Sequence, residues 1–223
     1  MIHFFNSLVF YLSIFFISSI FAKSTESTSL YFHNSSANTQ LQREVEIEVP
    51  WTGAPGEMEN FIHGDTTSTG EQAHDIYILQ SDRVYLQVRE LELNHSCAII
   101  GAEYNEDAGE HPATVQPILG NNGDLLFTGW PQNHIKTYGT DQHYLIKNIL
   151  FNGVIAGQEG ILFGVLSTYG DYNTVIVDSV TSVHHMVISY LNFGYAQTLH
   201  LTNNVAVQFT SYVDGMWWGG FLW

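Results

Sequence analysis

The sequence has little cysteine and little positive charge. Its one cysteine, Cys97, cannot close an internal disulfide or build a thiolate metal cage, so neither device holds the fold together. Only 6 Lys and Arg stand against 22 Asp and Glu, which gives a formal net charge of -16. Because nucleic-acid binding depends on many cations that neutralise phosphates, we expect neither DNA nor RNA as a partner.

Long apolar runs are absent after the first 22 residues. Residues 2–22 are almost continuously apolar, carry no charge and end in small side chains before a polar stretch. This pattern predicts a signal peptide at 1–22 that is cleaved after Ala22, although its usual N-terminal positive charge is missing. An uncleaved N-terminal anchor is the alternative, and no later segment is long enough to span a bilayer. In both cases the remainder is expected to be secreted, or exported to the periplasm or outer surface of a bacterium.

Helical periodicity is also absent over any useful length. Residues 23–72 are rich in Ser, Thr, Asn, Glu and Gly, which predicts a polar leader and a small N-terminal cap. Within this region, the alternating run Val45–Val49 predicts an edge strand, and Pro55-Gly56 predicts a turn.

From residue 73 onward, short β-type runs alternate with polar or turn residues. On both sides of Asn203-Asn204, alternating apolar residues predict two strands that face a common core, through Leu199 and Leu201 and then through Val205, Val207 and Phe209. The other expected strands are Ile76–Leu79, Val84–Val88, Leu91–Leu93, Ala98–Ile100, Val115–Leu119, Asp124–Phe127 and Thr174–Val180. The sequence therefore predicts an all-β fold.

Glycine spacing suggests how these strands are arranged. Gly153, Gly194 and Gly215 each follow an apolar run, and their spacing fits a solenoid with about 21 residues per coil. Stacked coils place like residues on like, so that asparagines can form ladders along the axis. A β-sandwich is the competing fold, since short alternating strands with turn signals are typical of it too.

Several segments resemble a known family. Tyr77–Tyr85, Leu91–Leu93 and Ala98–Gly101 resemble the first coils of secreted right-handed parallel β-helix proteins of the pectin-lyase-like superfamily. Tyr144–Gly153 is similar to the rung consensus of the same group. The resemblance covers residues 75–215 and implies a right-handed parallel β-helix over 73–223. It does not fix the activity, because the superfamily contains polysaccharide lyases, glycoside hydrolases, epimerases and non-catalytic surface proteins.

The resemblance also implies candidate catalytic groups. In lyases of this kind, Ca²⁺ acidifies the proton beside a uronate carboxylate and a lysine or arginine removes it, so Lys147 is a candidate base. Asp178 and Asp214 are candidate acid and base groups for glycoside hydrolysis. Asp171 and Asp178 offer the oxygen ligands that suit Ca²⁺. The alternative interpretation is that these charged residues keep the surface soluble.

Aromatic residues are the more suggestive feature, because flat rings among Asn, Asp and His suit stacking on sugars. A surface with a net charge of -16 favours neutral or weakly charged glycans over polyanions. The alternative is that these side chains pack under loops. His200 together with either His184 or His185 also suggests a zinc site between adjacent coils, but no third ligand is identifiable. The candidate substrate-binding residues are Trp130, Tyr169, Tyr172, Tyr190, His185 and His200.

Two functions follow from these features. The first is a non-catalytic protein that binds extracellular or cell-surface polysaccharide, and it is favoured because no convincing base is present. The second is a polysaccharide lyase or a glycoside hydrolase. The chain is also expected to end at Trp223 without a C-terminal cap. A truncated helix explains this best, and an aromatic plug or end-to-end self-association of two chains are the alternatives.

Overall fold

The computed structural model describes residues 45–118, 132–153, 164–185, 188–195 and 197–207, and the backbone of three further strands within 211–222. All of these residues belong to the compact unit formed by residues 41–223. The predicted signal peptide, the expected strand Asp124–Phe127, and the candidates Trp130 and Asp214 lie outside the described residues.

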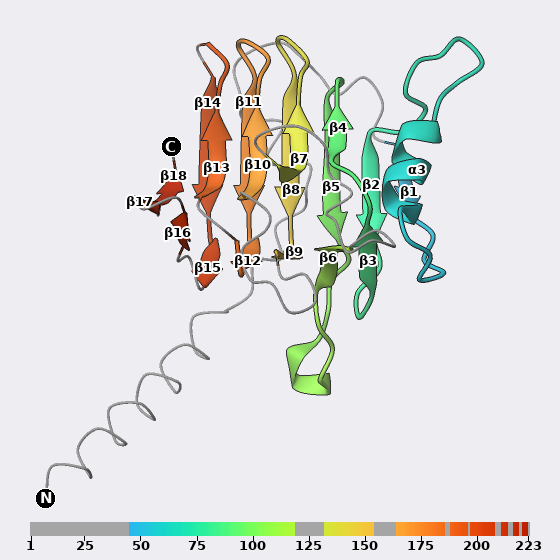
Figure 1. The fold of residues 1–223 in the computed structure, drawn as a ribbon. Helices are drawn as coiled ribbons and strands as arrows, with labels where there is room; N and C mark the ends of the chain where they lie inside the picture. The colour runs from blue at the N-terminus through green and yellow to red at the C-terminus, as the bar shows by residue number, and fades with distance from the viewer. Residues whose placement is uncertain are drawn as a thin grey trace, which may run out of the picture. The chain divides into compact units, whose positions relative to one another are not determined.

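Most of the described residues form three parallel sheets (Figure 1). Sheet 1 has the strand order β1 (Glu46–Glu48), β2 (Ile76–Leu79), β5 (Cys97–Gly101), β8 (His143–Lys147), β11 (Thr174–Asp178) and β14 (Thr198–Thr202). Sheet 2 contains β3 (Val84–Gln87), β6 (Ala113–Pro117), β9 (Ile149–Asn152), β12 (Thr181–Val183) and β15 (Val205–Val207). Sheet 3 contains β4 (Leu91–Leu93), β7 (Asn133–Thr137), β10 (Gly164–Thr168), β13 (Ile188–Asn192) and β18 (Gly220–Leu222).

The order of the strands follows a simple cycle. From β2 to β15 the chain visits sheets 1, 2 and 3 in turn, and each new strand pairs in parallel with the strand of the preceding visit. The antiparallel pair of β16 (Ser211–Val213) and β17 (Met216–Trp218) lies outside this cycle. The predicted all-β class is confirmed. Parallel pairing differs from the antiparallel pairing of a β-sandwich, which was the competing prediction.

The predicted coil of about 21 residues is wrong for most of the chain. In sheet 1 Ile76 pairs with Ala98, Ala98 with Leu145, and Leu145 with Ile176. If one pass of the chain through the three sheets is counted as a coil, the coil from Ala98 to Leu145 is more than twice as long as the coil from Ile76 to Ala98. The glycine spacing misled because the glycines are not equivalent: Gly153 follows β9 of sheet 2, whereas Gly194 follows β13 of sheet 3.

The hydrophobic core lies between the three sheets and contains side chains from each. Alternate residues of each strand point inward, so that Tyr77 of sheet 1, Phe151 of sheet 2 and Leu166 of sheet 3 belong to one buried cluster. Leu199 and Leu201 pack against this cluster, as predicted.

The predicted inward face of β15 is wrong. Val205 and Val207 are 37% and 43% exposed, whereas Ala206 between them is less exposed. Period-two alternation defines two faces but does not say which one is inside. In this strand the smaller side chain points inward.

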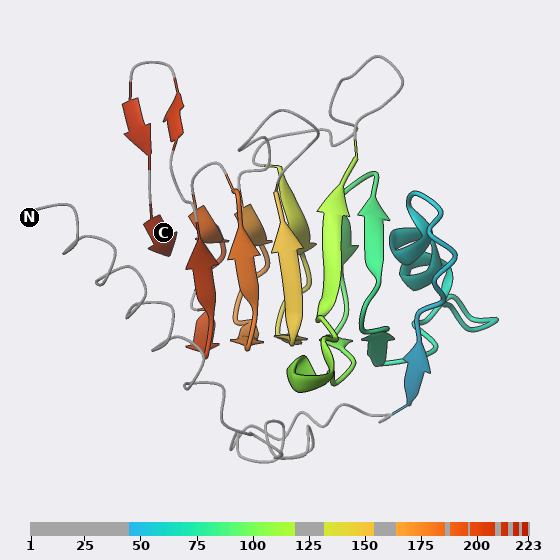
Figure 2. The ribbon, with the colours of Figure 1, turned by 90° about the horizontal axis from the view of Figure 1, so that it is seen from below.

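The cap region contains the predicted edge strand β1 and a helix that the sequence analysis missed. Figure 2 shows α3 (Glu57–Gly64) beyond β2, at one end of the row of strands. Met58 and Ile62 of this helix join the core. Glu59 is fully buried, and its Oε1 accepts hydrogen bonds from the backbone N–H groups of Val88 (2.8 Å) and Arg89 (3.3 Å). The helix is therefore fixed to the turn that follows β3. A second, 3₁₀ helix, η1 (Glu106–Ala108), lies between β5 and β6.

Candidate functional site

The chain passes from sheet 3 into sheet 1 through a five-residue turn motif that the sequence repeats three times. The motif has an aromatic residue first, glycine second and Asn or Gln fifth, and it occupies 138–142, 169–173 and 193–197. Pairing of Thr137 with Thr168 and of His143 with Thr174 places the first two copies in register. Equivalent side chains therefore lie one above the other.

The glycines of the motif are required by close approach of the backbone. A Cβ atom on Gly170 would lie 1.6 Å from the carbonyl oxygen of Gly139, and one on Gly194 would lie 2.0 Å from that of Gly170. Both distances are far below van der Waals contact, so no larger residue fits without moving the main chain. The copies consequently stack tightly.

Amide side chains at the fifth position satisfy the backbone of neighbouring copies. Asn173 Nδ2 donates to the carbonyl of Gly139 (2.7 Å), and its Oδ1 accepts from the backbone N–H of Gln142 (2.8 Å). Gln197 Nε2 donates to the carbonyl of Gly170 in the same way. This amide ladder fixes the height of each copy, and with it the position of each aromatic ring.

The first residues of the motif form an aromatic ladder of Tyr138, Tyr169 and Phe193. The ring centroids of Tyr138 and Tyr169 are 5.1 Å apart at an interplanar angle of 16°, and those of Tyr169 and Phe193 are 4.9 Å apart at 14°. Tyr169 therefore has a ring on each face. Although the sequence analysis proposed Tyr169 as a sugar platform, the structure places it where only its edge remains accessible.

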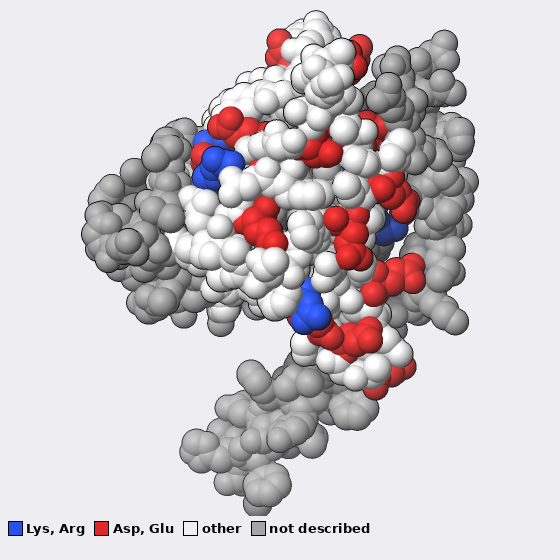
Figure 3. All heavy atoms as spheres, turned by 90° about the vertical axis from the view of Figure 1, so that its right-hand side faces the viewer, with Lys and Arg blue, Asp and Glu red and all other residues white. Residues whose placement is uncertain are grey.

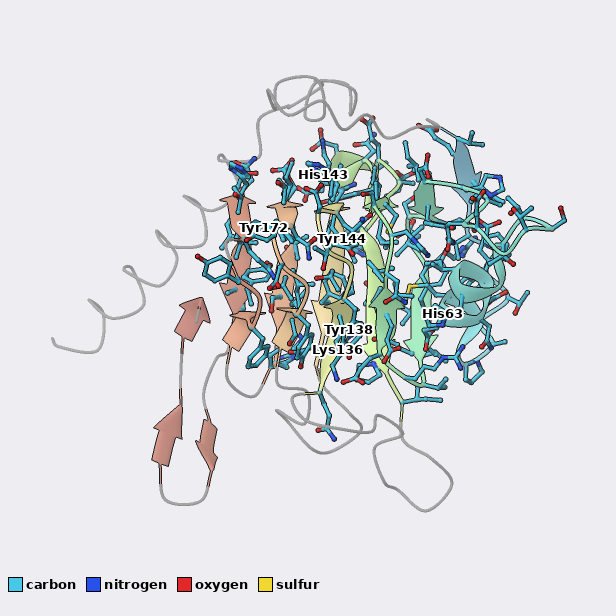
Figure 4. The ribbon with its side chains drawn as sticks, turned by 90° about the horizontal axis from the view of Figure 1, so that it is seen from above. His63, Lys136, Tyr138, His143, Tyr144 and Tyr172 are labelled. Carbon is cyan, nitrogen blue, oxygen red and sulfur yellow. The ribbon has the colours of Figure 1, made fainter. Side chains whose placement is uncertain are left out.

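Tyr172 and Tyr195 are the freely exposed rings at this corner. Their exposed fractions are 58% and 70%, and their rings meet edge to face with centroids 5.9 Å apart at 85°. Tyr172 adopts φ 57°, in the left-handed region that costs energy for a bulky residue. The backbone N–H of Tyr195 donates to Asp171 Oδ1 (2.8 Å), and that of Tyr172 donates to the carbonyl of Tyr195 (2.9 Å). These bonds hold the backbone of both tyrosines in place (Figure 4, where Tyr172 is labelled).

A buried ion pair lies on sheet 3, on the strand that leads to the aromatic ladder. Lys136 Nζ is 2.7 Å from Glu90 Oε1, and the two side chains are only 6% and 7% exposed. Burial raises the pKa of the Glu90 carboxyl, whereas the Lys136 ammonium beside it lowers it. Lys136 pairs in register with Glu92 and Ser167, and Tyr138 follows it by two residues (Figure 4).

The structure brings together two of the predicted catalytic residues, Lys147 and Asp178. They are register partners in sheet 1, with Nζ 3.7 Å from Oδ2. Asp178 is 1% exposed, and its Oδ1 accepts hydrogen bonds from Thr202 Oγ1 (2.8 Å) and Asn203 Nδ2 (2.9 Å). This arrangement ties adjacent coils together at the corner between sheets 1 and 2. A carboxylate that is so deeply buried does not reach a polymer at the surface.

The predicted Ca²⁺ ligands Asp171 and Asp178 are not brought together. They lie before and at the end of β11, so at about 3.3 Å per residue they are on the order of 20 Å apart. One ion cannot bind both. Within the part of the chain that the structure describes, no group of three or more His, Cys, Asp or Glu residues is placed to hold a metal ion.

The other predicted ligand-binding residues are divided between the interior and the surface. Tyr190 and His185 are each 1% exposed and therefore cannot contact a polysaccharide. His200 is exposed on β14, where it pairs with Ile176. His184 and His185 follow β12 of sheet 2, so the histidines of the suggested zinc site lie on different sheets.

His185 instead forms a buried chain of hydrogen bonds with His134. The two Nε2 atoms are 3.0 Å apart, His185 Nδ1 is 3.0 Å from Ser182 Oγ, and His134 Nδ1 is 2.6 Å from Gln87 Oε1. Gln87 Nε2 donates to the carbonyl of His134 (2.7 Å), so its Oε1 must be an acceptor. His134 Nδ1 then donates, its Nε2 accepts from His185, and His185 Nδ1 accepts from Ser182. Both rings are neutral in this scheme.

The substrate-binding candidates chosen from the sequence did not include Tyr138, Phe193 and Tyr195, although a signal was present for the two residues that belong to the ladder. Each tyrosine or phenylalanine of the ladder is followed by glycine and, three residues later, by Asn or Gln. Aligning the three copies of the motif gives the correct register of neighbouring strands within sheet 3 and within sheet 1. The glycine spacing did not.

No helix of the described residues is both long and apolar enough to cross a membrane. Searches of protein-family models, of curated proteins and of solved structures find no match to this chain, so the candidate site rests on its own geometry.

Proposed function

We propose that this chain is a secreted right-handed parallel β-helix protein, similar to the pectin-lyase-like superfamily, that binds extracellular or cell-surface polysaccharide without strong catalytic activity. The cyclic visit to three parallel sheets supports this architecture. Right-handedness follows from the general preference of parallel crossover connections.

The observation that carries the binding function is the exposed pair Tyr172 and Tyr195. The two rings are 58% and 70% exposed and lie side by side, and backbone hydrogen bonds hold both residues in place. A prearranged pair of rings loses little entropy when a sugar stacks on it. The amide ladder and the aromatic ladder supply the rigid support.

Two further observations favour binding over turnover. Asp178 is buried and Lys147, whose side chain is 16% exposed, lies beside it, so the pair is positioned as a contact between strands and not as a free acid or base. The net charge of -16 also opposes a polyanionic uronate substrate.

The test is a panel of neutral and uronate polysaccharides with the wild-type protein and the double variant Tyr172→Ala, Tyr195→Ala. We expect the affinity for at least one neutral glycan to fall by about 5- to 160-fold, since two stacked aromatic contacts of about 0.5–1.5 kcal/mol each are lost. Tyr104→Ala is the matched control, because Tyr104 is a partly exposed tyrosine in the connection between β5 and β6. Unchanged retention by the double variant would remove the tyrosine pair as the site. Release of unsaturated oligosaccharides from a uronate polymer would show a lyase instead. Formation of new reducing ends without unsaturation would show a glycoside hydrolase.

A further inference from the structure

A cavity of about 350 Å³ lies between α3 and the first strand of sheet 3. Ile62 and Tyr77 contribute to its lining, together with the thiol of Cys97. Polar groups of His63, Glu92 and Asn94 also line it. Burial raises the pKa of the Cys97 thiol to about 12, so this group is a neutral part of the wall and not a nucleophile. The volume is at the lower end of the range of small-molecule sites.

The cavity lies beside the position at which the aromatic ladder stops. Leu93 pairs with Thr137, and the backbone N–H of Tyr138 donates to the carbonyl of Leu93 (2.9 Å), so Asn94 is the neighbour of Tyr138 in the preceding coil. Asn94 has no ring. Tyr138 therefore stacks on Tyr169 but has no described ring on the side of Asn94, and it is 39% exposed. The ladder has a vacant position for one more flat ring.

An acidic residue, Glu92, lines the cavity on the strand that pairs with β7. Glu92 is exposed and forms no ion pair with any residue in the described ranges. Glu92 pairs in register with Lys136, and Tyr138 follows Lys136 by two positions, so Glu92 and Tyr138 lie on the same face of sheet 3. His63 Nε2 lies 3.1 Å from the backbone carbonyl oxygen of Glu92.

Nearby cations already have partners. Lys136 pairs with the buried Glu90, and Arg89 Nη2 donates to Asn60 Oδ1 (2.7 Å). Desolvation lowers the pKa of His63, and the Arg89 charge adds to this, so the imidazole on the cavity wall is neutral near pH 7. The open negative charge at this position is therefore Glu92, and it suits a ligand that carries one positive charge.

We propose that the cavity and the free face of Tyr138 form a subsite for a sugar unit that carries a free amine, such as a terminal 2-amino-2-deoxyhexose of the bound polysaccharide. The sugar ring occupies the vacant ladder position against Tyr138. Its ammonium group pairs with Glu92, and its hydroxyls face Asn94 and the cavity. The proposal rests on the polysaccharide-binding function above, and it narrows the ligand class.

Calorimetric titration with three tetrasaccharides tests this inference: β-1,4-linked glucosamine, its N-acetylated form, and the corresponding glucose oligomer. The wild-type protein is expected to bind the free-amine oligomer up to about fivefold more tightly than the other two, because only its ammonium group pairs with the exposed Glu92 carboxylate. Glu92→Gln should abolish the preference. Glu103→Gln, which removes an exposed carboxylate in the connection between β5 and β6, should retain it. Asn94→Phe should fill the vacant position and weaken all binding at this subsite.

The outcomes separate the two proposals. Equal affinity for the three oligomers, or a preference that survives in Glu92→Gln, would overturn the subsite while polysaccharide binding through Tyr172 and Tyr195 stands. An equal loss in Glu92→Gln and Glu103→Gln would also overturn it, because that result indicates general attraction of a cation to an acidic protein. If no glycan of either set binds, the proposed function itself fails.

Discussion

His134 and His185 are buried as neutral rings, and every ring nitrogen has a partner. Burial lowers the pKa of His185 to about 3, and desolvation together with His185 lowers that of His134 well below its ordinary value. Protonation of His134 at Nε2 would place its N–H opposite the N–H of His185. Protonation of His185 at Nδ1 would remove the acceptor of the Ser182 hydroxyl. The unfolded chain binds these protons near the ordinary histidine pKa of about 6.5.

The pH dependence follows from that difference. Because both folded pKa values are depressed, the contribution of each histidine to stability is complete above about pH 6.5 and is lost as the pH falls, for His185 down to about pH 3. We expect the free energy of unfolding, measured with urea, to fall by up to about 1.4 kcal/mol per pH unit per histidine in this window. His185→Gln should make the dependence shallower, whereas the exposed His200→Gln should not change it. Identical profiles for wild type and His185→Gln would contradict the neutral hydrogen-bonded chain.

At the level of single residues, the sequence indicated which side chains could take part in chemistry or binding, but not whether each is buried or which residue it contacts. Tyr172, a candidate for stacking on sugars, has an exposed ring in a turn. Lys147 and Asp178, candidate catalytic groups, instead lie beside each other on neighbouring strands of sheet 1. No local pattern shows whether a carboxylate at the end of a strand faces water or a lysine of the preceding coil, because the partner is 31 positions away in sequence.

Among the elements, the turn motif between sheets 3 and 1 makes the most specific demand on sequence. Gly139, Gly170 and Gly194 leave no room for a side chain, and the amides of Asn173 and Gln197 each donate to a carbonyl of the preceding copy. The motif therefore sets the height at which each aromatic ring of the ladder is held.

Replacement of Gly170 by alanine tests this requirement. The added methyl would overlap the Gly139 carbonyl, so the main chain must shift, and we expect a loss of about 2–3 kcal/mol in the free energy of unfolding. Gly64→Ala is the control, since nothing lies within 4 Å of a Cβ there and alanine is a better helix former. Urea denaturation of both variants measures the difference. Equal stabilities would show that the copies separate easily.

Strands were predicted more accurately than their stacking. The expected strands Ile76–Leu79 and Leu91–Leu93 coincide with β2 and β4, because β-branched and apolar residues with flanking turns determine strands locally. The coil length was wrong because connections of different lengths separate the strands, and these leave no periodic trace. Helix α3 was missed because its eight residues are too few to show a convincing helical period.

At the scale of the whole molecule, acidic charge is spread widely over the surface. Figure 3 shows red carboxylates over most of the described part of one face and few blue side chains. Two of the cations, Lys136 and Lys147, are largely buried beside carboxylates, so they do little to offset the repulsion at the surface. The net charge of -16 therefore acts mainly as self-repulsion.

Salt should consequently stabilise the protein. Raising the ionic strength from about 0.01 M to about 1 M shortens the Debye length from about 30 Å to about 3 Å, which screens repulsion between surface carboxylates. The buried Glu90–Lys136 pair is screened much less. We expect the midpoint of thermal unfolding to rise with sodium chloride concentration. A falling midpoint would show that attractive surface pairs outweigh the repulsion.

The order of strands within each sheet has a consequence for motion. In sheets 1 and 2 the strands stand in the order in which the chain makes them, so β2 meets β5, and β11 meets β14, but β2 and β14 never meet. Opening one end therefore does not require opening the other. Amide protons should exchange with solvent fastest in the outermost coils and slowest around β8. The molecule then unfolds locally from its two ends before it unfolds as a whole.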